Sequence, residues 1–241
     1  MEDTKDYLEK IDRLYETLQD DAAVEAAIKQ MIEDYAAEKG TADAVYATLN
    51  NELGSFYRHR ERYPEGEAAF LQAVETLTAL GDIAETELAV TRNNLAELYR
   101  LQGKLDQAEE QLTASLEVFI AAGNDQVVPY AAALNYLGHV KLDRGLFDEA
   151  VDNYERSRDL LIRTDGPTFM LITAYANLVS AFIKEGRLRK AVSTVDEAQQ
   201  QLGDAGNDND QFKMLITLRG VLEDQANQLG LPDEEEGICM K

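Results

Sequence analysis

The sequence holds few side chains that could perform catalysis. It has two histidines, His59 and His139, and one cysteine, Cys239. Nucleophilic catalysis needs a nucleophile beside a base, and a zinc site needs a cluster of Cys, His or carboxylate ligands, so neither can be assembled convincingly. No glycine-rich phosphate loop occurs, since Gly103-Lys104 lacks the preceding glycine of such a loop. We therefore expect no enzyme, no cofactor and no metal site.

The charge balance restricts the class of partner. Asp and Glu number 46 against 23 Lys and Arg, which gives a formal net charge of −23. Nucleic acid and anionic lipid both need clustered positive charge, so we expect neither as a partner. The uncharged stretch 166–183 is interrupted by Pro167 and Asn177, and we interpret it as a buried helix rather than a membrane span. With one cysteine and a charged N-terminus, the expected location is cytoplasmic.

Asparagines recur at a constant spacing. Asn51, Asn93 and Asn135 are evenly spaced along the chain. Asparagine is a mediocre helix former, so three in register need a reason. Its amide both donates and accepts, and a row of amides could bind the backbone of an extended peptide. The same amides could instead join neighbouring helices, and the sequence leaves both interpretations open.

Polar and cationic residues flank the asparagine column. An Arg near Asn residues could hold a ligand carboxylate through paired hydrogen bonds, or it could pair with nearby acidic residues of its own chain such as Glu52 and Glu97. Both possibilities stay open at this point. The candidate peptide-binding residues are Asn51, Asn93, Asn135, Asn94, Asn177, Arg58, Arg100 and His139.

These residues belong to a repeat that appears when the chain is aligned with itself. The segment that starts at Asn93 recurs from Asn135 and again from Ala176, and it also occurs upstream from Asn51. The period is about 42 residues, within the range of helical repeat arrays. One column holds a leucine followed by a smaller residue, and a turn residue comes eight positions after the leucine. Its members are Leu53, Leu95, Leu137 and Leu178, with the turn residues Glu61, Gly103, Gly145 and Gly186.

Each repeat predicts two helices. Apolar residues follow each other at three- and four-residue steps, and small residues at fixed places allow two helices to approach closely. A glycine is expected to end each second helix in the left-handed conformation, at Gly40, Gly81, Gly123, Gly166 and Gly203. The predicted pairs span about 4–40, 43–81, 86–123, 127–165 and 168–204. A closing helix at 211–229 and a loose acidic tail at 230–241 follow, and 1–229 form one domain.

The columns resemble the tetratricopeptide repeat: leucine, small and aromatic in the first helix, then small, large and small in the second. Consensus repeats have about 34 residues. The longer period here resembles kinesin light chain and its many bacterial relatives, above all in NNLAELYRLQGKLDQAEEQL. The resemblance is strong over residues 43–204. It implies an all-α fold, a right-handed α-α superhelix whose first helices line a concave groove for a peptide or a partner helix.

The expected function is therefore that of a non-enzymatic protein- or peptide-binding scaffold or adaptor. The alternative is a structural, self-associating component of a larger assembly, and homo-oligomerisation stays open. An accessory that positions another enzyme's substrate is a variant of the first interpretation.

Overall fold

The structure, a computed structural model, describes residues 4–18, 20–122, 127–206 and 208–232. Within these ranges all regular structure is helical. The helices are α1 (Thr4–Thr17), α2 (Asp21–Lys39), α3 (Ala44–His59), α4 (Tyr63–Leu80), η1 (Gly81–Ala84), α5 (Glu85–Leu101), α6 (Leu105–Ala122), α7 (Val127–Asp143), α8 (Phe147–Arg163), α9 (Thr168–Glu185), α10 (Leu188–Leu202), η3 (Gly203–Gly206) and α11 (Asp210–Gln228). The predicted all-α fold of consecutive helix pairs is confirmed.

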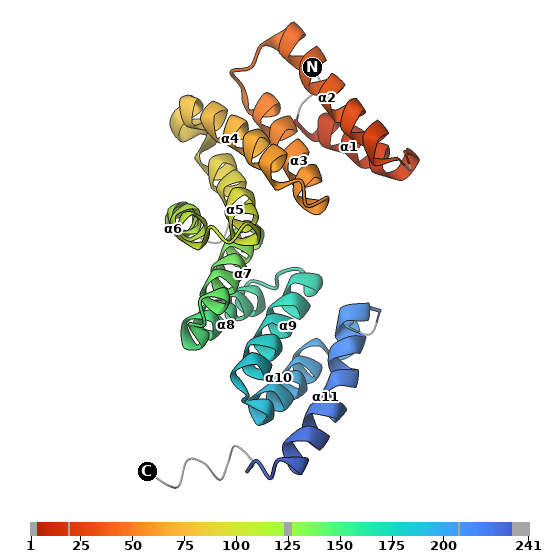
Figure 1. Ribbon diagram of the computed structural model, residues 1–241, viewed down its shortest axis with the longest axis vertical. Helices are drawn as coiled ribbons and strands as arrows, with labels where there is room; N and C mark the ends of the chain where they lie inside the picture. Colours follow the sequence, from red (N-terminus) through yellow and green to blue (C-terminus); the bar gives the residue numbers. More distant parts are fainter. Residues whose placement is uncertain (1–3, 19, 123–126, 207, 233–241) are drawn as a thin grey trace. The chain divides into compact units, whose positions relative to one another are not determined.

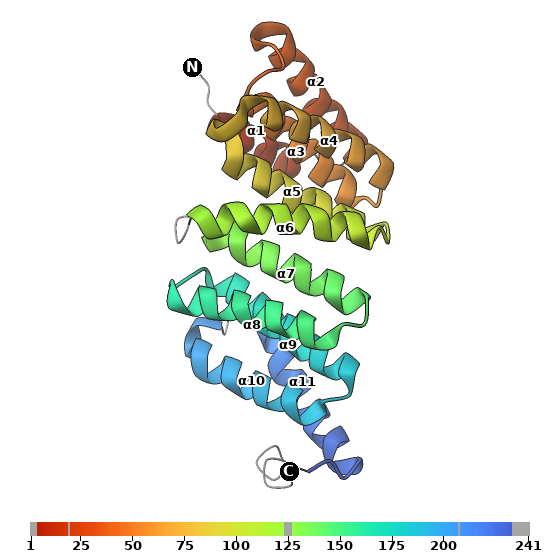
Figure 2. The same ribbon diagram turned by 90° about the vertical axis from the view of Figure 1, so that its left-hand side faces the viewer.

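The chain divides into two compact units, residues 1–121 and 122–241. In the first unit α3 packs against α4 and α4 against α5, as Figure 2 shows for α3 and α4. In the second unit α7 packs on α8, α8 on α9, α9 on α10 and α10 on α11; α9, α10 and α11 are the blue-green to blue helices of Figure 1. The single domain over 1–229 stays a prediction.

A small residue in the first helix meets a large residue in the second helix of the same pair. A Cβ atom added at Gly54 in α3 would lie 2.7 Å from the ring of Phe70 in α4. A Cβ atom at Gly138 in α7 would likewise collide with the ring of Tyr154 in α8. Phe70 and Tyr154 are both fully buried. The small residues of the repeat are therefore the points of closest approach within a pair.

Two buried serines, at the same column of successive repeats, fasten a second helix to the first helix that precedes it. The Ser115 hydroxyl of α6 donates to the Ala89 carbonyl of α5 at 2.9 Å. The Ser157 hydroxyl of α8 donates to the Ala131 carbonyl of α7 at 3.1 Å. The Ser115 hydroxyl also lies 2.9 Å from the Gln111 carbonyl of its own helix. Both buried hydroxyls thus have hydrogen-bond partners. The repeat thus fixes polar contacts as well as apolar ones.

Three of the second helices end at a predicted glycine, but none of these glycines takes the expected left-handed helical conformation. Gly40, Gly81 and Gly203 have positive φ angles of 91°, 66° and 49°, and their ψ angles are −170°, −146° and −132°. At the end of α8, however, Asp165 takes the positive φ, at 50°, and Gly166 does not. A Cβ atom at Gly166 would lie 2.6 Å from a methyl group of Leu161, so this glycine is needed for space. Gly123 lies outside the described residues.

Helix α11 closes the second unit by packing on α10. Its Phe212, Leu215, Leu222 and Ala226 are buried in the core of that unit. The loose tail expected from Gly230 is wrong for its first residues, because Leu231 packs against the same core and its carbonyl accepts bonds from Arg189 at 3.0 and 3.2 Å. Residues 233–241 of the predicted tail lie outside the described residues.

A carboxylate network joins α2 to the next helix pair. Glu25 accepts hydrogen bonds from Lys29 at 2.7 Å and from the Tyr57 hydroxyl at 2.8 Å, and Arg62 donates to its other oxygen. The bonds from Lys29, Arg62 and Tyr57 together outweigh partial burial and lower the pKa of Glu25 to about 2. The folded state therefore favours the ionised form of this side chain.

The close approach at Gly138 predicts a size-dependent effect. Replacing Gly138 by Ala should destabilise the protein by about 1–3 kcal/mol, because Tyr154 must shift out of a filled site. The pair Gly138→Ala with Tyr154→Leu reproduces the Ala96 and Leu112 combination found at the same columns. It should recover stability relative to Tyr154→Leu alone, as measured by urea denaturation. Additive losses would show that the two positions do not share one packing site.

The Glu25 network predicts a pH dependence. A lowered folded-state pKa stabilises the fold above the unfolded pKa, near 4.5, and this contribution disappears as the pH falls through about 2. Glu25→Gln should therefore lower the free energy of unfolding by about 1 kcal/mol at pH 7, since its partners are partly exposed. The difference from wild type should shrink between pH 4.5 and 2. Glu33→Gln, at an exposed position of α2, serves as the control.

Candidate functional site

One face of the first helices carries the asparagine column. In α9 this first-helix face consists of Thr173, Ala176, Asn177 and Ser180, all half-buried or exposed. The equivalent residues lie one, two and three repeat periods earlier in the other first helices, α7, α5 and α3. Helical spacing of three and four residues places these side chains on the same side of each helix.

The three column asparagines are buried. Asn51, Asn93 and Asn135 expose 8%, 3% and 5% of their surface. Each of them therefore keeps little surface with which it could bind a peptide in the free protein.

Amide groups bridge adjacent first helices in both units. In the first unit Asn94 of α5 donates to the side-chain oxygen of Asn51 in α3 at 3.0 Å. In the second, Asn177 of α9 donates to the side-chain oxygen of Asn135 in α7 at 3.2 Å. A buried amide that loses its partner costs about 1–3 kcal/mol, so each bridge helps to fix the spacing of two helices. These contacts support the interpretation of the column as a link between repeats.

His139 extends the bridge in the second unit. Its Nε2 atom lies 3.3 Å from the side-chain oxygen of Asn177. Its ring meets that of Tyr154 edge-on, with the ring centres 5.7 Å apart. The imidazole is thus positioned both by the amide bridge and by the residue that packs against Gly138. It lies half-buried on the first-helix face.

The two candidate arginines differ in their surroundings. Arg100 is paired within α5, because its Nε and Nη2 atoms donate to the two carboxylate oxygens of Glu97 at 2.8 and 2.7 Å. The buried Nη1 atom of Arg58 in α3 has no hydrogen-bond partner among the described residues. Burial raises the pKa of nearby Glu52, and the positive charge of Arg58 acts against this increase. The expected pairing with an acidic residue of the same chain thus holds for Arg100.

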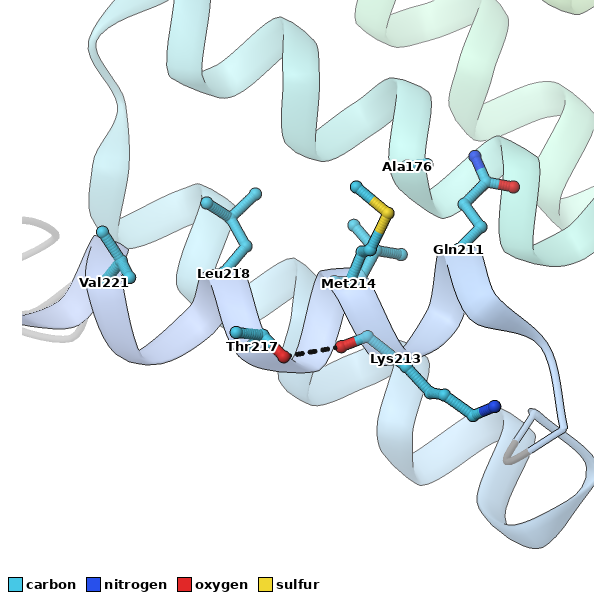
Figure 3. A pocket seen from close by; sticks show the side chains of 8 residues that line it. Ala176, Gln211, Lys213, Met214, Thr217, Leu218 and Val221 are labelled. Atoms are coloured by element: carbon cyan, nitrogen blue, oxygen red, sulfur yellow. Dashed lines mark hydrogen bonds between the residues drawn. The ribbon is translucent and has the colours of Figure 1, made fainter.

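Helix α11 departs from the polar pattern of this face. One period after Thr173, Asn177 and Ser180 of α9 stand Met214, Leu218 and Val221 of α11. Met214 is 71% exposed and Val221 is 59% exposed. Figure 3 shows these apolar side chains along one edge of α11. The first-helix face therefore changes from polar to apolar at the last helix.

An open pocket of about 590 Å³ lies between α9 and α11 at this position (Figure 3). Its lining residues are Ala176, Gln211, Lys213, Met214, Leu215, Thr217, Leu218 and Val221. Ala176 stands where Asn135 stands in α7, and Leu218 stands where Asn177 stands in α9. The amide bridge is thus replaced by an alanine and a leucine, which cannot hydrogen-bond across the gap. The pocket occurs where the bridge is missing.

Sequence reasoning placed Ala176 on the first-helix face but missed the pocket. It treated α11 only as a closing helix and did not extend the column alignment into it. The spacing from Asn135 to Ala176 is 41 residues, and the same step from Asn177 leads to Leu218. This step alone would have indicated an apolar site. The pocket itself depends on the distance between α9 and α11, and the sequence alignment does not specify this distance.

The described residues contain no group of three or more His, Cys, Asp or Glu side chains that could hold a metal ion. None of the described helices is long and apolar enough to cross a membrane.

The amide bridge of the second unit predicts coupled effects on stability. Asn135→Ala and Asn177→Ala should each lower the free energy of unfolding by about 1 kcal/mol, because each leaves the other amide without its partner. The double variant should lose less than the sum, as measured by chemical denaturation. Ser180→Ala, at an exposed position of α9, is the matched control. Unchanged stability in all variants would mean that the bridge does not join the helices.

Comparison with known proteins agrees with the repeat pattern. Residues 45–121 match the family model of the tetratricopeptide repeat. No curated protein is significantly similar in sequence to the chain. The structure of BtubC (BKLC) from P. vanneervenii is similar with a TM-score of 0.68 and 20% identity, over 84% of this chain and 81% of that one.

Two further solved structures are similar. A Podosopora anserina protein described as a putative kinesin light chain with nearly identical TPR-like repeats has a TM-score of 0.66 and 15% identity, over 87% of this chain and 100% of that one. The Rap conjugation gene regulator of the plasmid pLS20, in complex with the Phr* peptide, has a TM-score of 0.56 and 13% identity, over 95% of this chain and 74% of that one. On its repeat columns, its helix pairs and these likenesses, the chain has the fold of kinesin-light-chain-like tetratricopeptide repeats.

Proposed function

We propose that this chain is a non-enzymatic scaffold that binds a protein or peptide on its first-helix face. The observation that carries the proposal is the apolar pocket between α9 and α11, where Met214, Leu218 and Val221 replace the polar Thr173, Asn177 and Ser180 of α9. Tetratricopeptide-like repeats form protein-interaction scaffolds, and the similar Rap regulator was solved with a peptide. A cytoplasmic location fits the single cysteine of the sequence.

The pocket suits an apolar side chain of a polypeptide. Met214, Leu218 and Val221 offer apolar surface, and burying a side chain the size of leucine contributes about 1.5–3 kcal/mol. Gln211 and Thr217 supply polar groups at the same site, which could pair with the backbone of the bound segment. A few polar groups around an apolar pocket are typical of a site that binds with defined orientation.

In the second unit, Asn177 and His139 of the first-helix face would contact the remainder of the ligand, and the first unit carries candidate polar contacts of its own. Asn94, Asn177, Arg58, Arg100 and His139 are half-buried, so each keeps some surface for a partner. The column residues Asn51, Asn93 and Asn135 are proposed to act mainly through the positions of these neighbours. In the first unit, Arg58 is the candidate whose buried Nη1 atom has no described hydrogen-bond partner.

Selection of random displayed peptides on the full chain tests the proposal. Enriched peptides should bind Met214→Glu/Val221→Glu at least ten times more weakly than wild type, because a ligand would have to enclose charge in the pocket. Both side chains are exposed in the free protein, so the double variant should keep its melting temperature. Binding is measured by fluorescence anisotropy.

Ile162→Glu on α8 is the control, since it also adds a charge at an exposed apolar residue of the second unit. Its peptide affinities should equal those of wild type. The proposal fails if no peptide is enriched, or if the enriched peptides bind the α11 double variant as tightly as wild type.

A further inference from the structure

Helix α11 carries two apolar stripes, although closing a stack requires only one. Leu215 and Leu222 form the first stripe and are buried at 5% and 2% exposure. Both belong to the core that α11 shares with α10. Met214, Leu218 and Val221 form the second stripe on the first-helix face, and Figure 3 shows them on one edge of α11. A terminal helix normally presents a polar outer surface, so the second stripe requires its own explanation.

The spacing of the second stripe indicates the shape of what covers it. Gln211, Met214, Leu218, Val221 and Gln225 follow each other at steps of three, four, three and four residues. This alternation is the spacing of a seam between two helices packed side by side. The apolar residues Met214 to Val221 extend for about 10 Å along the helix, and a glutamine flanks them on each side. It matches about two turns of a facing helix.

Charge distinguishes a foreign helix from a second copy of this chain. Each copy carries a net charge of −23, so association of two copies brings like charges together. Asp210 at the start of α11 is 94% exposed, and Asp224 near its end is exposed as well. Lys213, the charged side chain of the pocket lining, is already paired with Asp210 at 3.0 Å. A covering helix with cationic flanks complements these charges.

We infer that the α9–α11 pocket binds a basic amphipathic helix of a partner protein, which lies along Met214, Leu218 and Val221. The inference rests on the proposed function and specifies its ligand. The helix presents apolar residues three and four positions apart to the pocket, and Lys or Arg residues on its flanks face Asp210 and Asp224. The missing amide bridge between Ala176 and Leu218 leaves the space for its apolar side chains.

Two matched peptide libraries test this ligand class on the full chain. Both use an Ala/Lys/Gln host, long enough for about five helical turns, with randomised apolar positions at three- and four-residue steps. One of them carries a central proline that breaks the helix. The helical library should yield binders and the proline library should not. Inserting the proline into an enriched peptide, or using Met214→Glu/Val221→Glu, should weaken binding at least tenfold. Ile162→Glu should leave it unchanged.

A third arm exchanges Lys for Glu in the enriched peptides, and this should weaken binding several-fold at low salt and less at high salt. Light scattering should show a monomer. Three results would overturn the inference. Proline-containing or acidic peptides could bind as tightly as the enriched peptides, or the helical library could yield no binders. The third result is a dimer of the wild-type chain that Met214→Glu/Val221→Glu abolishes. If random unconstrained peptides still bind in those cases, and their binding is weakened by Met214→Glu/Val221→Glu, the proposed function remains supported. Loss of all peptide binding at the pocket would contradict both.

Discussion

The structure depends on the close approach of the two helices in each pair. At Gly54 and Gly138 the first helix has no Cβ atom, and the rings of Phe70 and Tyr154 fill the space. Because this contact recurs at the same columns of the repeat, the pairs present equivalent residues in equivalent places. The serine bonds to the preceding first helix and the amide bridges between first helices all require that constant spacing. The pairing of a small residue with a large one thus helps to position the serine bonds and the amide bridges.

The amide bridges and the pocket are two results of one position in the repeat. Where asparagines face each other, as in Asn135 and Asn177, a hydrogen bond joins the adjacent first helices. Where Ala176 and Leu218 replace them, the helices share no such bond and an apolar pocket lies between them. The same change removes a structural contact and leaves the pocket that we propose binds a partner. Residue choice at this column therefore decides whether two adjacent first helices share an amide bridge or a pocket.

Much of the fold follows from the sequence because helix pairing is local. The repeat period, the leucine and small-residue columns and the turn residues predicted the outer ends of the helix pairs and of the closing helix to within a few residues, but not the short helices η1 and η3. The glycine at the end of α8 was misassigned because both Asp165 and Gly166 stand at the turn, and only the fit of Gly166 against Leu161 decides which one takes the positive φ. Leu231 was assigned to a loose tail because a contact with α10 leaves no periodic signal.

The sequence by itself determined the fold, the acidic character and the residues that share the first-helix face, because helical period and repeat length fix which side chains line up. Only the tertiary structure decided how those residues act. It showed that the asparagines are buried and bonded across helices, that Arg100 is paired with Glu97, and that Met214 and Val221 are exposed beside a pocket. Burial, pairing and pocket formation depend on distances between helices, and these distances arise from packing in three dimensions.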